Sequence, residues 1–180
     1  MSRPRDVTAA ASARLAAAVT LHGADLLAFL ERRVVPVEDA ADLLGEVFLV
    51  ATRRVADLPA DGLEVRLWLF GVARGVLAND RRGRRRRLAA MQRLRDEVMR
   101  VHRVTQPASA AHEVVQEAVA DLPEELRELV MLVHWDGFAI GEAARVLGLN
   151  PSTGRSRYAR ARQVLEAALS VEEVGHDGAQ

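Results

Sequence analysis

The fold of this chain is decided by residues 147–162, which read LGLNPSTGRSRYARAR. Gly148 is typical of the residue that ends a helix, and Asn150 followed by Pro151 is typical of a helix start. The preceding residues, Ile140–Val146, form a short apolar pattern that predicts another helix. Two short helices joined by a tight turn, the second of them basic, are typical of a DNA-binding helix-turn-helix.

The second helix of this pair carries the side chains expected to contact duplex DNA. Its N-terminal half is expected to read bases in the major groove, and its later arginines to contact phosphates. The predicted residues are Ser152, Thr153, Arg155, Ser156, Arg157, Arg160 and Arg162. The alternative is a solvated amphipathic helix whose arginines only face water.

The composition of the whole chain favours helices and excludes several classes of protein. Its 180 residues are 49% hydrophobic but only 4% aromatic, which suits one large or two small helical domains. There is no cysteine, so a disulfide framework, a cysteine zinc site and a thiol nucleophile are excluded. We find no apolar run near the roughly 18 residues of a membrane span and no secretory signal. We therefore expect a cytoplasmic protein without membrane insertion.

The formal net charge is zero, yet the charges are segregated along the chain. Residues 81–87 read RRGRRRR, whereas residues 113–128 and the tail after Leu165 are rich in Asp and Glu. Local patches determine nucleic-acid affinity better than total charge does, so the arginine run predicts a nucleic-acid arm. A basic run can also be merely solvated or disordered, and the sequence leaves both interpretations open.

We expect an all-α fold of two small helical domains joined by a flexible linker, with the helix-turn-helix in the second domain. Helices are predicted over residues 13–33 with a break near Gly23, from Pro36–Asp39 onward, and from about residue 63 into the arginine run. The predicted boundaries are 13–95 for the first domain, 96–111 for the linker, 112–170 for the second domain and 171–180 for a disordered acidic tail.

Nothing in the sequence has the pattern of an enzyme, a cofactor site or a metal site. The five histidines are scattered, and none has a metal-ligand spacing to a carboxylate or to another histidine. There is no glycine-rich phosphate loop. We therefore predict a non-enzymatic protein without a cofactor or a metal ion.

Several motifs, taken in order, carry a resemblance to a known family. They are DAADLLGEVFL at residues 39–49, WLFGVAR at 68–74, the arginine run, LPEELR at 122–127, DGF at 136–138 and the segment from Glu142 to Arg162. With this order and spacing, over about Leu15 to Leu169, the chain resembles a bacterial RNA polymerase sigma factor of the extracytoplasmic-function (ECF) group in the sigma-70 family.

The resemblance implies a subunit whose first domain binds core RNA polymerase and reads and melts the −10 promoter element. The second domain would read the −35 element as duplex DNA. The implied polymerase-binding residues are Asp39, Asp42, Leu43, Glu46, Val47 and Phe48. The implied −10 and melting residues are Trp68, Arg74, Asn79, Arg81, Arg82, Arg84 and Arg85, although Trp68 can also be interpreted as a core residue. Many family members are held inactive by an anti-sigma partner, which this sequence does not identify.

Four residues depart from the pattern of the family. Gly75 stands where Asn is usual, Ala139 where a Ser or Thr cap is usual, Gly154 where an apolar residue normally packs the reading helix, and Gly45 where a polar residue is usual in the polymerase-binding helix. We expect Gly75 to weaken or alter −10 base capture, and Ala139 and Gly154 to make the helix-turn-helix less rigid. Two other functions stay open on sequence alone: a stand-alone helix-turn-helix regulator that never binds polymerase, and a degenerate sigma-like interaction module.

Overall fold

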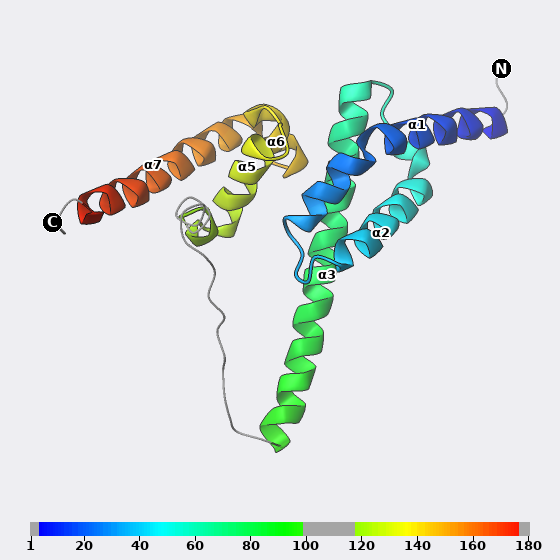
Figure 1. The fold of residues 1–180 in the computed structure, drawn as a ribbon. Coiled ribbons are helices and arrows are strands. Elements are labelled where there is room, and N and C mark those ends of the chain that lie inside the picture. The colour runs from blue at the N-terminus through cyan, green and yellow to red at the C-terminus, as the bar shows by residue number, and fades with distance from the viewer. Residues whose placement is uncertain (1–3, 99–117, 177–180) are drawn as a thin grey trace. The chain divides into compact units, whose positions relative to one another are not determined.

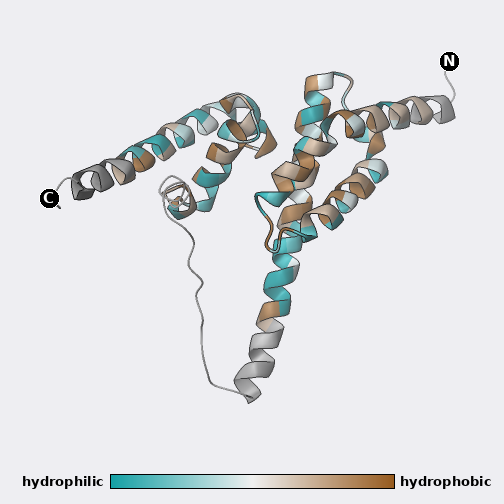
Figure 2. Cartoon of the chain, in the orientation of Figure 1, coloured by the Kyte–Doolittle hydropathy of each residue, from teal (hydrophilic) through white to brown (hydrophobic). Residues whose placement is uncertain are grey.

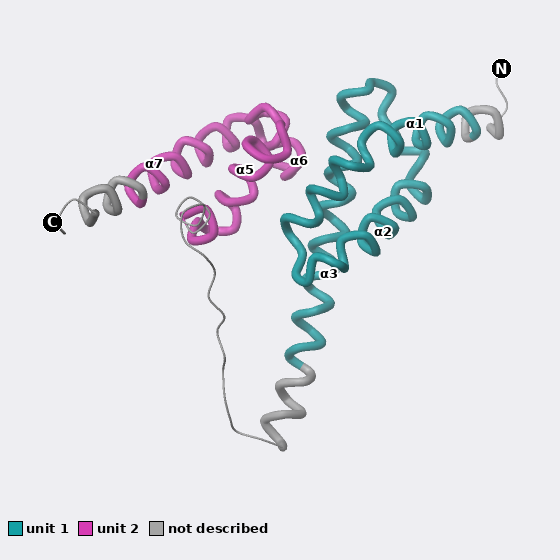
Figure 3. The backbone as a smooth tube through the Cα atoms, viewed as in Figure 1, with its two compact units in different colours: residues 1–100 teal, residues 101–180 magenta. Residues whose placement is uncertain are grey.

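The computed structural model describes the backbone of residues 4–98 and 118–176, and the side chains of residues 9–89 and 118–168. Every element within these ranges is a helix, which confirms the all-α prediction. The chain divides into two compact units, residues 1–100 and 101–180 (Figure 3). Residues 96–98 of the predicted linker are helical, and its residues 99–111 lie outside the described part of the chain.

Unit 1 consists of α1 (Pro4–Glu31), α2 (Asp39–Arg53), the short 3-10 helix η1 (Val55–Asp57) and α3 (Gly62–Val98) (Figure 1). The apolar sides of the three long helices meet in one core, in which Phe29, Val47 and Phe70 are each at most 1% exposed. The rings of Phe29 and Phe70 contact edge to face, with centroids 5.3 Å apart, an arrangement that aromatic pairs prefer. Beyond this core α3 continues with the hydrophilic arginine run (Figure 2).

The first helix is longer and more regular than the sequence predicted. It begins at Pro4 and runs without interruption through Gly23, so the predicted break near Gly23 is wrong. A single helical glycine costs about 1 kcal/mol, which burial of neighbours such as Leu15 and Leu26 offsets. By length and composition alone, Ala9–Glu31 could also cross a membrane, contrary to our expectation. Core helices of globular proteins and signal sequences pass the same test; 28% of the tested window is buried, and Leu26 lies in the core of unit 1.

Unit 2 contains a helical segment at residues 118–121, followed by α5 (Glu124–His134), α6 (Ile140–Val146) and α7 (Pro151–His176) (Figure 1). A buried cluster joins the segment at residues 118–121 to α5 and α7, and Leu165 packs against it; the cluster is Val119, Leu122, Leu126, Val130 and Ala161. The order of two short helices followed by a long one is the expected setting for the helix-turn-helix.

The last helix also exceeds its predicted length. We expected residues 171–180 to be disordered, but α7 continues to His176, so the expectation is wrong for residues 171–176. Residues 177–180 lie outside the described part of the chain. After Gly154 the helix meets no proline or glycine before Gly175, and the intervening residues are rich in the strong helix formers Ala, Leu and Glu.

Candidate nucleic-acid interface

The turn between α6 and α7 ends α6 in a Schellman motif. Gly148 has a φ of 70°, in the left-handed region that glycine adopts without strain from a Cβ. Its N–H donates to the carbonyl of Arg145 at 3.0 Å, and the N–H of Leu149 donates to the carbonyl of Ala144 at 2.8 Å. This geometry confirms the helix end predicted at Gly148.

The two helices of the motif begin with unequal caps. Asn150 Oδ1 accepts a hydrogen bond from the backbone N–H of Ser152 at 2.9 Å, as predicted for the start of α7. Pro151 has no backbone N–H, so it leaves no donor unsatisfied in the first turn. At the start of α6, Ala139 has no side-chain acceptor. Glu142 Oε2 nevertheless accepts the N–H of Ala139 at 2.9 Å, so half of a capping box remains. The departure at Ala139 is therefore only partly compensated.

Gly154 is buried where α7 crosses α6. A Cβ added to it would lie 2.5 Å from the Cβ of Ala144 and 3.5 Å from the carbonyl oxygen of Ile140. Carbon atoms in contact need roughly 3.5–4.0 Å, so only glycine fits at this crossing. The expectation that Gly154 loosens the motif is therefore wrong, because the missing side chain lets the two helices pack more closely.

The first three turns of α7 expose one continuous face. Ser152 and Ser156 lie at its centre, opposite the buried Gly154, because successive residues of a helix turn by about 100°. Arg155 and Arg160 flank the two serines on either side. The predicted DNA-contacting residues that are exposed are Ser152, Thr153, Arg155, Ser156, Arg160 and Arg162.

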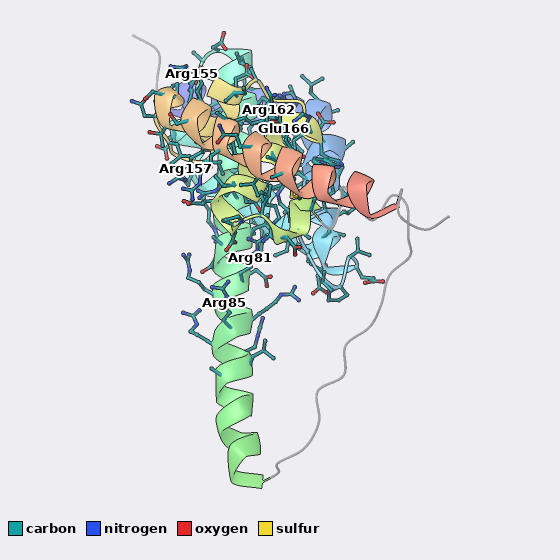
Figure 4. The ribbon with its side chains drawn as sticks, turned by 90° about the vertical axis from the view of Figure 1, so that its left-hand side faces the viewer. Arg81, Arg85, Arg155, Arg157, Arg162 and Glu166 are labelled. Atoms are coloured by element: carbon teal, nitrogen blue, oxygen red, sulfur yellow. The ribbon has the colours of Figure 1, made fainter. Side chains whose placement is uncertain are left out.

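Two of the predicted arginines on α7 are engaged in ion pairs. The guanidinium of Arg157 lies 2.9 Å from Glu125 of α5, and 33% of its side chain is exposed. The guanidinium of Arg162 lies 2.7 Å from Glu166 one turn further along α7 (Figure 4), and its hydrogen bond with Glu166 raises the pKa of Arg162. Arg157 therefore braces α7 against α5, a role that the sequence did not indicate.

In unit 1 the predicted DNA-contacting residues follow α3 from the core into the arginine run. Trp68 is half-buried, and the guanidinium of Arg54 lies 5.9 Å from its ring centroid. Trp68 is therefore in part a core residue, and its role as a stacking platform stays a prediction. Arg81 and Arg84 are also half-buried. The exposed members of the predicted set are Arg74, Asn79, Arg82 and Arg85.

The predicted polymerase-binding residues of α2 do not share one face. Leu43 and Val47 are 7% and 0% exposed in the core, so their role is to pack α2 and the prediction of direct contact is corrected. Asp42 and Glu46 are exposed one turn apart. Leu49, which the prediction omitted, is 57% exposed on the same helix. Phe48 is half-buried, as is Asp39, which binds Arg84.

Sequence reasoning missed a contact that joins α5 to α7. His134 Nε2 and the hydroxyl of Tyr158 lie 2.8 Å apart in a hydrogen bond, and their rings stack at 6.0 Å. Neighbouring Trp135 is 44% exposed. Together with the ion pair of Arg157 and Glu125, this contact holds α7 against α5 and so orients the exposed face of α7.

Comparison with known proteins finds one matching family and several related sigma factors. Residues 112–165 match the family described as Sigma-70, region 4. The ECF RNA polymerase sigma factor EcfG of Rhodopseudomonas palustris is 32% identical over 136 residues, covering 74% of this chain and 72% of that protein. The ECF RNA polymerase sigma factor SigM of Mycobacterium tuberculosis is 33% identical over 138 residues, covering 77% and 68%.

Two solved structures are similar over most of the chain. The sigma factor RpoE of Bartonella quintana, in complex with the anti-sigma factor NepR, matches with a TM-score of 0.63 and 26% identity, covering 85% of this chain and 94% of that one. CnrH, in complex with the cytosolic domain of CnrY, matches with a TM-score of 0.61 and 24% identity, covering 93% and 97%. The second likeness is one of fold alone.

Proposed function

The chain belongs to the ECF RNA polymerase sigma factors, and we propose that its two helical units divide the work of promoter recognition. As a member of this family it directs promoter-specific transcription initiation with RNA polymerase. In our proposal unit 2 reads the −35 element as duplex, and unit 1 binds the polymerase and the opened −10 element. Each unit binds its promoter element weakly alone. Because the two units are joined in one chain, binding of one raises the effective concentration of the other at its own element.

The exposed face of α7 is the observation that carries this proposal. A helix that enters the major groove needs short hydrogen-bonding side chains that approach bases and long cations that reach them or the phosphates. Ser152 and Ser156 supply the first kind at the centre of the face, and Arg155 and Arg160 supply the second at its sides. The close packing at Gly154 supports reading, since it holds α7 at a fixed distance from α6.

In unit 1 the proposal assigns opposite charges to different partners. The exposed arginines of α3 bind the backbone of the opened strand, and half-buried Trp68 offers an aromatic surface beside them. The exposed Asp42 and Glu46 of α2, together with the apolar side chain of Leu49, bind the polymerase. A mixed acidic and apolar surface is suited to protein rather than nucleic acid.

Three further parts of the proposal follow from the family. The protein carries out no chemistry of its own, it acts in the cytoplasm, and it is inhibited by an anti-sigma partner. The similar RpoE structure contains such a partner, NepR, bound to the sigma factor. No particular surface of this chain is assigned to an inhibitor.

Transcription with purified core polymerase tests the proposal. The full chain should associate with core enzyme and start transcripts on genomic DNA at sites that share −35 and −10 sequences. Arg155→Ala should weaken initiation at these sites by about tenfold or more, which corresponds to the 1–3 kcal/mol of one good base contact. No association with core enzyme would favour a stand-alone regulator, and association without initiation would favour an interaction module.

A further inference from the structure

One arginine of the basic run differs from its neighbours in what it contacts. Each nitrogen of the Arg84 guanidinium has its own acceptor. Nε donates to Asp80 at 2.7 Å, Nη2 donates to Asp39 at 2.6 Å, and Nη1 donates to the carbonyl of Val35 at 2.9 Å. Only 31% of its side chain is exposed, whereas Arg85 beside it is exposed.

The charges around Arg84 make it a poor phosphate ligand. Two carboxylates, of Asp39 and Asp80, share this one cation, so the group as a whole is negative. Their hydrogen bonds raise the pKa of Arg84, the one to Asp80 being the larger cause. A phosphate approaching the guanidinium would meet both carboxylates and would have to displace charge-assisted bonds that are already short.

The position of Arg84 gives these bonds a mechanical consequence. Val76 and Leu77 are the last buried residues of α3 in the described part of unit 1, and beyond them the helix leaves the core. Arg84 lies past this point, and its bonds join α3 to the first residue of α2 and to the loop before it. Because the guanidinium is planar and its donors have fixed directions, three separate acceptors restrict the orientation of α3 relative to α2 as well as the distance between them.

We propose that Arg84 is a positioning residue for promoter opening, which sets the direction in which α3 carries the exposed arginines of the run relative to α2. This inference rests on the proposed function, in which those arginines bind the opened strand and α2 binds polymerase. Arg84 itself then makes no DNA contact, although its place in the run predicts one. Its effect reaches the DNA through Arg82 and Arg85.

The test compares Arg84→Met with Arg85→Met in holoenzyme assembled from the full chain and core polymerase, on a promoter identified by transcript mapping. Arg85→Met removes a phosphate ligand. It should reduce the slope of log K for promoter binding against the logarithm of the salt concentration by about 0.7–0.9. Arg84→Met should leave the slope unchanged. It should instead slow promoter opening at saturating holoenzyme by about tenfold or more, measured as permanganate reactivity of unpaired thymines; a misplacement of about 1 Å can cost a reaction up to about a hundredfold in rate.

Two further variants separate position from charge and from folding. Arg84→Lys keeps the charge but lacks the fork, so it should open promoters as slowly as Arg84→Met. Asp80→Asn keeps Arg84 and weakens one of its bonds, and should slow opening in the same direction with an unchanged salt slope, even where Arg84→Met fails to fold.

Three results would overturn the inference: a reduced salt slope for Arg84→Met, full opening by Arg84→Lys, or parental opening rates for both Arg84→Met and Asp80→Asn. Failure of the parent holoenzyme to form or to open any promoter would count against the proposed function instead, before any variant is compared.

Discussion

Replacing Gly154 with alanine is expected to destabilise unit 2, although alanine is the better helix former. The new Cβ would lie 2.5 Å from the Cβ of Ala144, about 1 Å inside ordinary contact. Overpacking costs about 1–3 kcal/mol, and the upper part of this range applies because neither Cβ can rotate away. Alanine recovers up to about 1 kcal/mol through helix propensity. The free energy of unfolding should therefore fall by about 1–2 kcal/mol.

Urea unfolding of the full chain can isolate this effect in unit 2. In a Trp68→Phe background, Trp135 is the sole tryptophan, so fluorescence reports on unit 2. Gly141→Ala is the matched control, since it makes the same change in α6 where an added Cβ meets nothing within 4 Å. That control should be neutral or stabilising by up to about 1 kcal/mol.

Exchanging the residue types at positions 144 and 154 tests the predicted clash directly. Ala144→Gly alone should cost about 1 kcal/mol through helix propensity. Combined with Gly154→Ala, it transfers the Cβ from α6 to α7 and removes the clash, so the double variant should be more stable than the sum of the single changes by at least about 1 kcal/mol. A Gly154→Ala variant as stable as the parent, or additive effects of the two changes, would refute the predicted clash between α6 and α7.

Three other predictions concern separate parts of the molecule. Ala139→Ser should stabilise unit 2 by about 1 kcal/mol in the same urea assay, because it supplies the missing N-cap acceptor; an unchanged midpoint would contradict this. Arg155→Ala should reduce the salt slope of −35 duplex binding by up to about 0.9, whereas Arg157→Ala should reduce it less, since Arg157 is paired with Glu125; equal slopes would contradict the distinction. Burial, and secondarily a nearby arginine, lowers the pKa of His22 from 6.5 in the folded chain. The unfolded chain therefore binds the proton first, so the stability of unit 1 should fall as pH drops below about 6.5, and urea midpoints of His22→Gln should show a weaker fall.

The parts of this fold that the sequence predicted correctly depend on local signals. The end of α6 at Gly148 and the start of α7 at Asn150 follow from what those residues do to their own backbone, and both are confirmed. The burial of Leu43 and Val47 could also have been predicted, because their four-residue spacing is that of one helix face. The resemblance assigned roles by motif position, and this did not separate the two faces of α2.

The parts that could not be predicted depend on distances between segments far apart in the sequence. Gly154 looks like a defect until the separation of α6 and α7 is known. Arg84 looks like any member of a basic run, and its acceptors Asp39 and Val35 are 45 and 49 residues away. In both cases the residue type matched a general rule, on helix propensity or on basic runs, while a specific contact determined its role.

The same contacts explain how a chain of zero net charge can bind DNA. Several of its acids are engaged by arginines that have structural roles: Asp39 and Asp80 with Arg84, and Glu125 with Arg157. Together these three carboxylates and two arginines carry a net charge of −1, and they contribute little to phosphate binding. The salt dependence of promoter binding should therefore follow the number of exposed arginines on α3 and α7 that reach phosphates, and not the net charge, because each neutralised phosphate releases its own counterions.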